Sequence, residues 1–162
     1  MSQPAPETEQ RNAGVIAPPP LIYVGFLVLA LAADFVFGGP SLGITNEARW
    51  ITGVMLVLLG LAVVIIAATR FRSAGTEIAP WRPSTAMVTT GLYRFTRNPM
   101  YLGMALVYAG LSVLANSVFA LACLFPVLAV VTYGVIKREE RYLEVTFGEA
   151  YRAYKGKVRR WI

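Results

Sequence analysis

The stretch TRNPMYLG, residues 96–103, places groups that could bind a charged ligand directly before a long apolar segment. Proline suits the first position of a helix and disfavours helical geometry in the residue before it, so a helix is expected to begin at Pro99, after Asn98 as its N-cap. The free N–H groups at such a helix end favour an anion such as a carboxylate. Arg97 could bind the same carboxylate, while the ring of Tyr101 could contact a cationic sulfonium.

A pair of carboxylates, Glu139 and Glu140, follows the next apolar segment. Carboxylates near the hydrocarbon boundary of a membrane are costly unless they pair with cations or serve a function. The turn between the two apolar segments is little more than Asn116 and Ser117, so an antiparallel helical hairpin is expected. This hairpin would bring both glutamates close to Tyr93 and the TRNPMYLG stretch. We therefore expect a pocket for a zwitterionic, partly aromatic ligand.

The chain contains no histidine and one cysteine, Cys123. Histidine-based acid–base catalysis and a disulfide within the chain are thereby excluded. No Cys/His cluster of the kind that holds zinc or haem exists, so the sequence predicts no metal site.

The elements that position these groups are predicted from hydropathy. Hydrophobic residues make up 56% of the 162 residues, which is too many for an ordinary soluble domain of this size. Four apolar segments account for the excess, at residues 21–37, 50–68, 100–115 and 118–136. Each approaches the roughly 20 residues that cross a bilayer core of about 30 Å. The fold class is therefore an all-α integral membrane protein with four transmembrane helices.

The segment after residue 136 is expected to form a cytoplasmic amphipathic helix. Residues at spacings of three and four would share one face of it, namely Glu140, Leu143, Phe147, Tyr151, Tyr154 and Val158. Such a helix can lie on a membrane surface with its basic residues towards the headgroups, so the bilayer is an expected partner.

Charge placement predicts the orientation. Of the 15 Lys and Arg residues, Arg49 alone falls in the first loop between apolar segments, and none falls in the third loop. Basic loops stay cytoplasmic, so both termini and the active site are expected on that side, in the bacterial inner membrane or its equivalent. The net charge of +6 is explained by this topology and by anionic lipids, not by a nucleic-acid partner.

Three regions follow from this layout. Residues 1–19 are expected to be a disordered cytoplasmic tail, and residues 20–69 the first transmembrane hairpin. Residues 70–162 hold nearly all the chemically capable side chains and are predicted to be the catalytic core. Within them, the loop 70–98 is too long and too aromatic for a passive connection, so we expect it to bind something.

At these residues the chain resembles a known family. The motif GLYRFTRNPMYLG followed, after a hairpin, by EERYLEVTFGEAYRAYKGKVRRW resembles the isoprenylcysteine carboxyl methyltransferases, which belong with the membrane phospholipid methyltransferases. The resemblance covers roughly residues 70–162 and includes AGT at 74–76. It implies an integral membrane methyltransferase that uses S-adenosyl-L-methionine without a Rossmann domain.

Site residues are carried over from this resemblance. The cofactor-binding residues it implies are Met87, Val88, Tyr93, Asn98, Pro99, Met100, Tyr101 and Glu139. Arg97 and Glu140 are predicted to be catalytic. Arg97 could bind a carboxylate, and Glu139 or Glu140 could take a proton from an amine acceptor, although positioning of the reactants is expected to matter more than proton transfer. Two positions depart from the family pattern. Asn98 stands where many members have histidine, and Val135 stands where the carboxyl methyltransferases place an arginine for the substrate carboxylate.

The predicted function is methyl transfer at the membrane, by direct displacement, to an apolar or amphipathic acceptor such as an isoprenylcysteine carboxylate or a lipid. A phospholipid amine, an isoprenoid or a small thiol stays possible, as does any oligomeric state, because Gly and Ala faces pack within or between chains. The alternatives are a small four-helix transporter, which would need an intramembrane ionisable residue such as Asp34, a non-catalytic membrane scaffold, and a membrane reductase with the same hairpin.

Overall fold

The computed structural model describes residues 13–76, 82 and 84–162, and these residues are helical without any β-strand. The elements are α1 (Pro19–Phe37), α2 (Asn46–Ser73), the 3₁₀-helix η1 (Gly91–Arg94), α3 (Pro99–Leu114), α4 (Val118–Val131), the π-helix η2 (Thr132–Ile136) and α5 (Lys137–Lys157). The all-α prediction is confirmed. The predicted tail falls mostly in 1–12, outside the described residues, as do 77–81 and 83 of the predicted binding loop.

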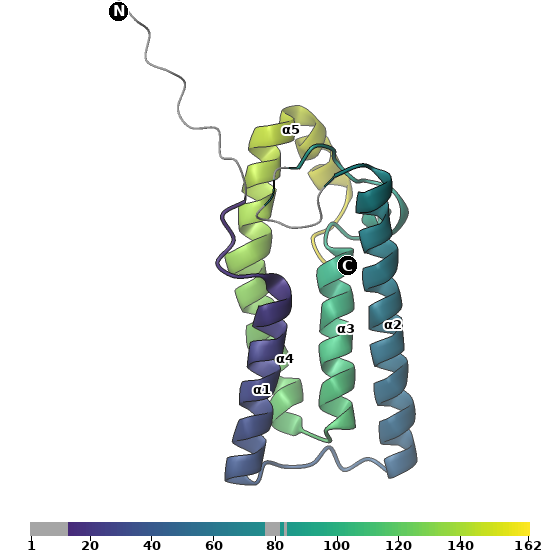
Figure 1. The fold of residues 1–162 in the computed structure, drawn as a ribbon, viewed down its shortest axis with the longest axis vertical. Helices are drawn as coiled ribbons and strands as arrows, with labels where there is room; N and C mark the ends of the chain where they lie inside the picture. The colour runs from purple at the N-terminus through teal and green to yellow at the C-terminus, as the bar shows by residue number, and fades with distance from the viewer. Residues whose placement is uncertain (1–12, 77–81, 83) are drawn as a thin grey trace, which may run out of the picture.

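The long helices stand side by side in a bundle (Figure 1), with α3 at its centre. Helix α3 packs against α2 on one side and against α4 and α1 on the other. Consecutive helices α1 and α2 therefore lie on opposite sides of α3. Helix α2 begins four residues before the predicted segment because Thr45 caps it, accepting a hydrogen bond at Oγ1 from the N–H of Ala48 at 3.2 Å.

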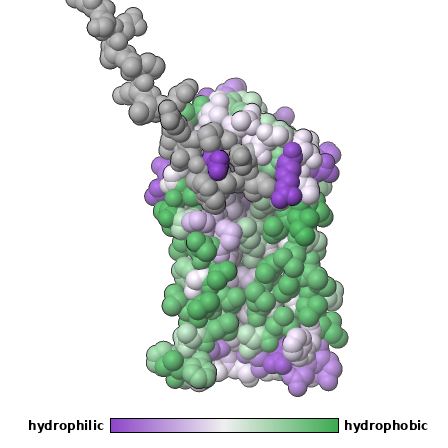
Figure 2. Space-filling view, in the orientation of Figure 1, coloured by the Kyte–Doolittle hydropathy of each residue, from purple (hydrophilic) through white to green (hydrophobic). Residues whose placement is uncertain are grey.

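Three of the described helices are long and apolar enough to cross a membrane: α1, α2 and the continuous helix Val118–Lys157 that contains α4, η2 and α5. Helix α3 is apolar but has 16 residues, so it spans about 24 Å. Figure 2 shows the resulting surface, with a hydrophobic belt along the bundle and hydrophilic residues gathered at its two ends. A membrane-embedded bundle is consistent with this surface, and the fourth span stays a prediction.

The core lies between α1, α3, α4 and η2. Its fully buried residues include Val127, Val131 and Val135, which are packed against aromatic rings from α1 and α3. The hydroxyl of Tyr23 donates a hydrogen bond to the carbonyl of Tyr101 at 3.0 Å, which fixes α1 to the first turn of α3. The core therefore holds the start of α3 rigidly.

Helix α2 joins the bundle through small residues. Its buried residues are Gly53, Gly60 and Ala67, which recur every seven residues, and the two glycines face Gly110 and Gly103 of α3. A Cβ at Gly60 would lie 2.6 Å from the carbonyl oxygen of Gly103, which is closer than such atoms can approach. Small residues at this spacing let two membrane helices pack backbone to backbone.

The predicted turn between α3 and α4 is confirmed at the opposite end of the bundle. Asn116 adopts the left-handed conformation with φ of 57°, and its Oδ1 accepts a hydrogen bond from the N–H of Leu42 at 3.1 Å. Ser117 caps α4 by accepting the N–H of Ala120 at 2.8 Å. Because this turn is tight, the start of α3 and the end of α4 must meet at the other end.

The C-terminal helix differs from the prediction of one straight amphipathic helix. Helix α5 continues α4 through the π-helix and then kinks at Gly148, where φ is 53° and ψ is −126°. Glycine has no Cβ and tolerates this conformation. The kink turns the second half of α5 back towards the bundle (Figure 1), and residues 158–162 then run beside the start of α3.

The close contact of α2 and α3 predicts the effect of one methyl group. Gly60→Ala is expected to destabilise the folded protein by about 1–3 kcal/mol, because the added Cβ forces the two helices apart. The matched control is Gly25→Ala in α1, where an added Cβ meets no atom within 4 Å. Thermal unfolding in detergent, followed by circular dichroism, should show a lower midpoint for Gly60→Ala alone. Equal midpoints would contradict this account of the interface.

Candidate functional site

A cavity lies at the end of the bundle where α2 ends, α3 begins and α4 passes into α5. It contains about 830 Å³ of space between atoms, including its open mouth. Small-molecule sites are concave and combine apolar surface with a few convergent polar groups, as this cavity does. The cavity is therefore the candidate site in the described part of the chain.

The structure brings the predicted site residues together. The cavity is lined by Met87, Val88, Tyr93, Arg97, Asn98, Met100, Tyr101, Glu139 and Glu140. Pro99 is the exception, because its ring is fully buried below the cavity at the first position of α3. The expected meeting of the start of α3 with the glutamates after α4 is confirmed.

Other residues lining the cavity had no predicted role. Leu143, Tyr151 and Tyr154 come from the two halves of α5, and their spacing had placed them on one helical face. Phe71 lies in the last turn of α2, and the hydroxyl oxygen of Tyr142 accepts a hydrogen bond from the N–H of Ser84 at 3.0 Å. Nothing in the local sequence pattern marks Phe71 or Tyr142.

The π-helix η2 leads directly into the two glutamates. A π-helix holds one residue more per turn than an α-helix, and such turns are frequent at functional sites. The indole N–H of Trp161 donates to Thr132 Oγ1 at 3.3 Å at the start of η2. Beyond η2, Glu139 and Glu140 are adjacent but bind different partners, so their pKa values shift in opposite directions.

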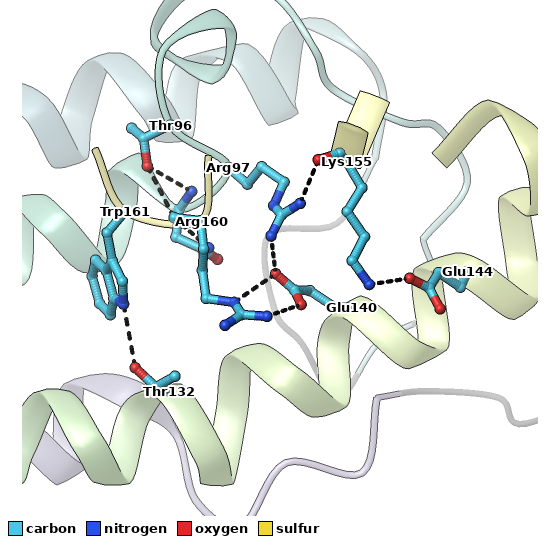
Figure 3. Close-up of polar contacts among 9 residues, drawn as sticks. Thr96, Arg97, Thr132, Glu140, Glu144, Lys155, Arg160 and Trp161 are labelled. Carbon is cyan, nitrogen blue, oxygen red and sulfur yellow. Dashed lines mark hydrogen bonds and ion pairs between the residues drawn. The ribbon is translucent and has the colours of Figure 1, made fainter. Parts of the chain in front are cut away.

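Glu140 is held between two arginines (Figure 3). Arg160 donates from Nε to Oε1 at 2.9 Å and from Nη2 to Oε2 at 2.7 Å, and Arg97 donates from Nη2 to Oε1 at 2.8 Å. Burial alone would raise the pKa of Glu140, but the hydrogen bond from Arg160 and the charges of Arg97, Arg160 and Lys155 outweigh it and lower the pKa. Glu140 is therefore a charged, fully bonded carboxylate.

Glu139 lies in the opposite environment. Its Oε1 accepts a hydrogen bond from the hydroxyl of Tyr101 at 2.5 Å, and no cation of the described residues forms an ion pair with it. Burial raises the pKa of Glu139 to about 7, although the Tyr101 hydrogen bond opposes the shift. The negative charge of Glu140 contributes to the increase. Glu139 can therefore gain or lose a proton near neutral pH.

Two buried donors beside the cavity lack a partner. The hydroxyl of Tyr93 and the Nε of Arg97 are buried and form no hydrogen bond with any described residue, and the Arg97 side chain is 8% exposed. Its Nη1 donates to the carbonyl of Lys155 at 3.0 Å. Buried donors are normally satisfied, so these two could bind a ligand that carries acceptor oxygens or nitrogens.

Asn98 begins α3 as predicted, but its side chain does not cap the helix. Its Nδ2 instead donates to the carbonyl of Arg160 at 2.9 Å. The capping prediction was wrong in this respect, because the returning C-terminal segment offers a carbonyl that competes for the amide. The N–H groups of the first turn of α3 are consequently not occupied by Asn98.

The arrangement can bind a zwitterion. Glu139 offers a carboxylate without a cation, and Tyr93 and Arg97 offer unsatisfied donors on the same cavity. Aromatic rings from Tyr151 and Tyr154 add flat apolar surface. Such a set can hold an ammonium, a carboxylate and an aromatic ring at once.

Comparison with known proteins relates this chain to a known family. The profile of the family described as "Phospholipid methyltransferase" matches residues 48–150, from the start of α2 to just past the kink in α5. An uncharacterized protein of Haemophilus influenzae is 44% identical over 64 residues, which cover 39% of this chain and all of that protein.

The raised pKa of Glu139 predicts a pH-dependent stability. The unfolded glutamate loses its proton near pH 4.5 and the folded one near 7, so folding stability falls as the pH rises between these values. We expect Glu139→Gln to match the wild type near pH 4.5 and to exceed it by about 1–3 kcal/mol at pH 8.

Thermal unfolding across pH 4.5–8 in detergent measures this difference. The matched control is Glu149→Gln, because the Glu149 side chain is 86% exposed. A Glu139→Gln curve parallel to the wild type at every pH would refute the assigned environment.

Proposed function

Since this chain belongs to the phospholipid methyltransferase family, we propose that it transfers a methyl group from S-adenosyl-L-methionine to an apolar or amphipathic acceptor at the membrane. The observation that carries the proposal is the cavity, because its lining combines the Glu139 carboxylate, which has no ion pair among the described residues, with two donors that have no acceptor among them. These groups fit a ligand that has an ammonium, a carboxylate and a nucleoside. The cavity supports the proposed site, and the family supports the proposed reaction.

The proposed cofactor-binding residues divide by chemistry. Glu139 would hold the ammonium, while the Arg97 Nε and the Tyr93 hydroxyl would hold acceptor atoms. The apolar lining of the loop before α3, with Met87 and Val88, would contact the nucleoside. Bound S-adenosyl-L-methionine supplies an electrophilic methyl group, so the protein mainly has to align the acceptor with it.

The two glutamates would have separate roles. Both oxygens of Glu140 are already bonded to arginines, so we assign it the positioning of Arg97 in preference to proton transfer. Glu139 forms no ion pair with the described residues, so its carboxylate is available for the ammonium of the methyl donor. Of the two carboxylates, Glu139 is therefore the better candidate for direct contact with the methyl donor.

The acceptor class is narrowed by Val135. The related carboxyl methyltransferases are expected to place an arginine at this position, and here Val135 is fully buried in the apolar core. Val135 cannot form an ion pair with the carboxylate of an acceptor. We therefore favour a lipid acceptor over an isoprenylcysteine carboxylate.

We further propose that α3 is the fourth transmembrane span and that the cavity faces the cytoplasm. Helix α3 is apolar and packs along α2, which is long enough to cross the membrane. Basic residues end α2 beside the cavity, at Arg70 and Arg72, whereas Arg49 lies at the opposite end. This asymmetry follows the positive-inside rule.

The transporter alternative has little support. Asp34 lies in the last turn of α1, at the end of the bundle opposite the cavity. A proton-coupled transporter would need an ionisable group near the middle of the membrane. The scaffold alternative is tested by the binding experiment below.

Tyr101→Phe tests the site directly. Removing this hydroxyl takes away the hydrogen bond to Glu139, and we expect the affinity for S-adenosylhomocysteine, the demethylated product, to fall roughly tenfold. Isothermal titration calorimetry with purified protein measures it. The control is Tyr108→Phe in the same helix, where the buried hydroxyl has no hydrogen-bond partner among the residues that the structure describes.

Methyl transfer is measured with radiolabelled S-adenosyl-L-methionine and membrane lipid extracts. Label is expected in a lipid fraction with the wild type and to be lost with Glu139→Ala. A wild-type protein that binds no S-adenosylhomocysteine, or a Tyr108→Phe variant as weak as Tyr101→Phe, would refute the proposed site.

A further inference from the structure

The last five residues, 158–162, form a strap across the start of α3, and this strap lies outside the part of the chain that the family profile matches. The N–H of Arg97 donates to the carbonyl of Arg159 at 2.9 Å. The carbonyl of Arg160 accepts from Thr96 Oγ1 at 3.2 Å and from Asn98 Nδ2 at 2.9 Å. The strap is thus paired with the residues that begin α3.

The strap is fastened on its other side by Trp161. Its ring packs against the hydrophobic core, and its indole N–H donates to Thr132 at the start of the π-helix (Figure 3). Backbone pairing and this ring fasten the strap at points separate from the Arg160 side chain. A variant that changes only this side chain therefore leaves these other contacts in place.

The Arg160 guanidinium reaches across to Glu140, twenty residues earlier in the chain. Arg160 donates to both carboxylate oxygens, whereas Arg97 donates to Oε1 alone. Without Arg160, Oε2 would lose its partner in a site where the Glu140 side chain is only 7% exposed. A buried carboxylate in that state turns towards its remaining cation, which here is Arg97.

Arg97 is the link to the cavity. Its guanidinium uses Nη1 for the carbonyl of Lys155 and Nη2 for Glu140, which leaves Nε unpartnered beside the cavity. The direction of Nε depends on both of these bonds. A rotation of Glu140 would therefore move the donor that we assign to the ligand.

We propose that Arg160 is a positioning residue for the methyl-donor site, acting through Glu140 to hold Arg97 in the orientation that binds the ligand. This inference rests on the proposed function, because the ligand is the one assigned there. It adds a residue from the strap to the site. The Arg160 side chain itself does not line the cavity, so its role would be indirect.

The charged and titratable groups around Glu140 come from three segments. They are Arg97 before α3, Arg160 in the strap, and Glu139, Tyr151 and Lys155 in α5. Removing the Arg160 charge leaves Glu140 with less compensation, so the pKa of Glu140 should rise towards neutral. Protonated Glu140 no longer attracts Arg97, so a variant without Arg160 should bind the ligand less well as the pH falls.

The test compares Arg160→Met with Arg159→Met. Both remove one positive charge from the strap, but the Arg159 side chain is exposed and its carbonyl, not its guanidinium, makes the structural contact. Calorimetric binding of S-adenosylhomocysteine at pH 8, 7 and 6 is the measurement. We expect Arg160→Met to bind roughly tenfold more weakly at pH 8, with a larger ratio to Arg159→Met at pH 6.

Two further variants separate positioning from folding. Arg160→Lys keeps the charge and should recover part of the affinity. Glu140→Gln should weaken binding, and adding Arg160→Met to it should weaken binding little further, because both act through one contact. Equal affinity and equal pH dependence of Arg160→Met and Arg159→Met, or fully additive losses with Glu140→Gln, would overturn the inference. Failure of the wild type to bind S-adenosylhomocysteine would overturn the proposed function and this inference with it.

Discussion

A carboxylate can be buried beside a membrane only when cations and hydrogen bonds replace the water that it loses, and Glu140 meets this condition through two arginines. Arg97 lies just before α3, and Arg160 lies in the C-terminal strap. Their common partner requires that the start of α3, the first turns of α5 and the end of the chain converge. The cavity occupies the space that this convergence encloses. The ion pairs of Glu140 with Arg97 and Arg160 therefore fix the position of the cavity at this end of the bundle.

The neighbouring glutamates show how environment divides chemistry between identical side chains. Glu140 is charged because its partners are charged, and its role is to hold other groups in place. Glu139 is hydrogen-bonded to Tyr101 and forms no ion pair in the described part of the chain, so burial raises its pKa. Its position costs folding stability above neutral pH, which is a common property of residues kept for function. A ligand with an ammonium group would supply the missing cation.

The bundle that carries this site depends on the close approach of α2 and α3. Gly53 and Gly60 face Gly110 and Gly103, so the two backbones meet without intervening side chains. Lipid provides no hydrophobic force between helices, and such packing is what holds them together in a membrane. On the other side of α3, ordinary apolar side chains pack against α1 and α4. This asymmetry lets the short helix α3 lie at the centre of longer ones.

Much of this protein is determined by local sequence. The positions of the apolar helices follow from hydropathy, and the antiparallel order of α3 and α4 follows from the Asn116-Ser117 turn, since a chain of two residues allows little else. That turn also explains why Tyr93, Tyr101 and Glu139 could be placed together in advance. The kink at Gly148, the amide of Asn98 that binds the strap in place of a cap, and the pairing of Arg160 with Glu140 were decided by tertiary structure. Each of these depends on groups distant in sequence competing for one partner, and local spacing carries no information about which of them prevails.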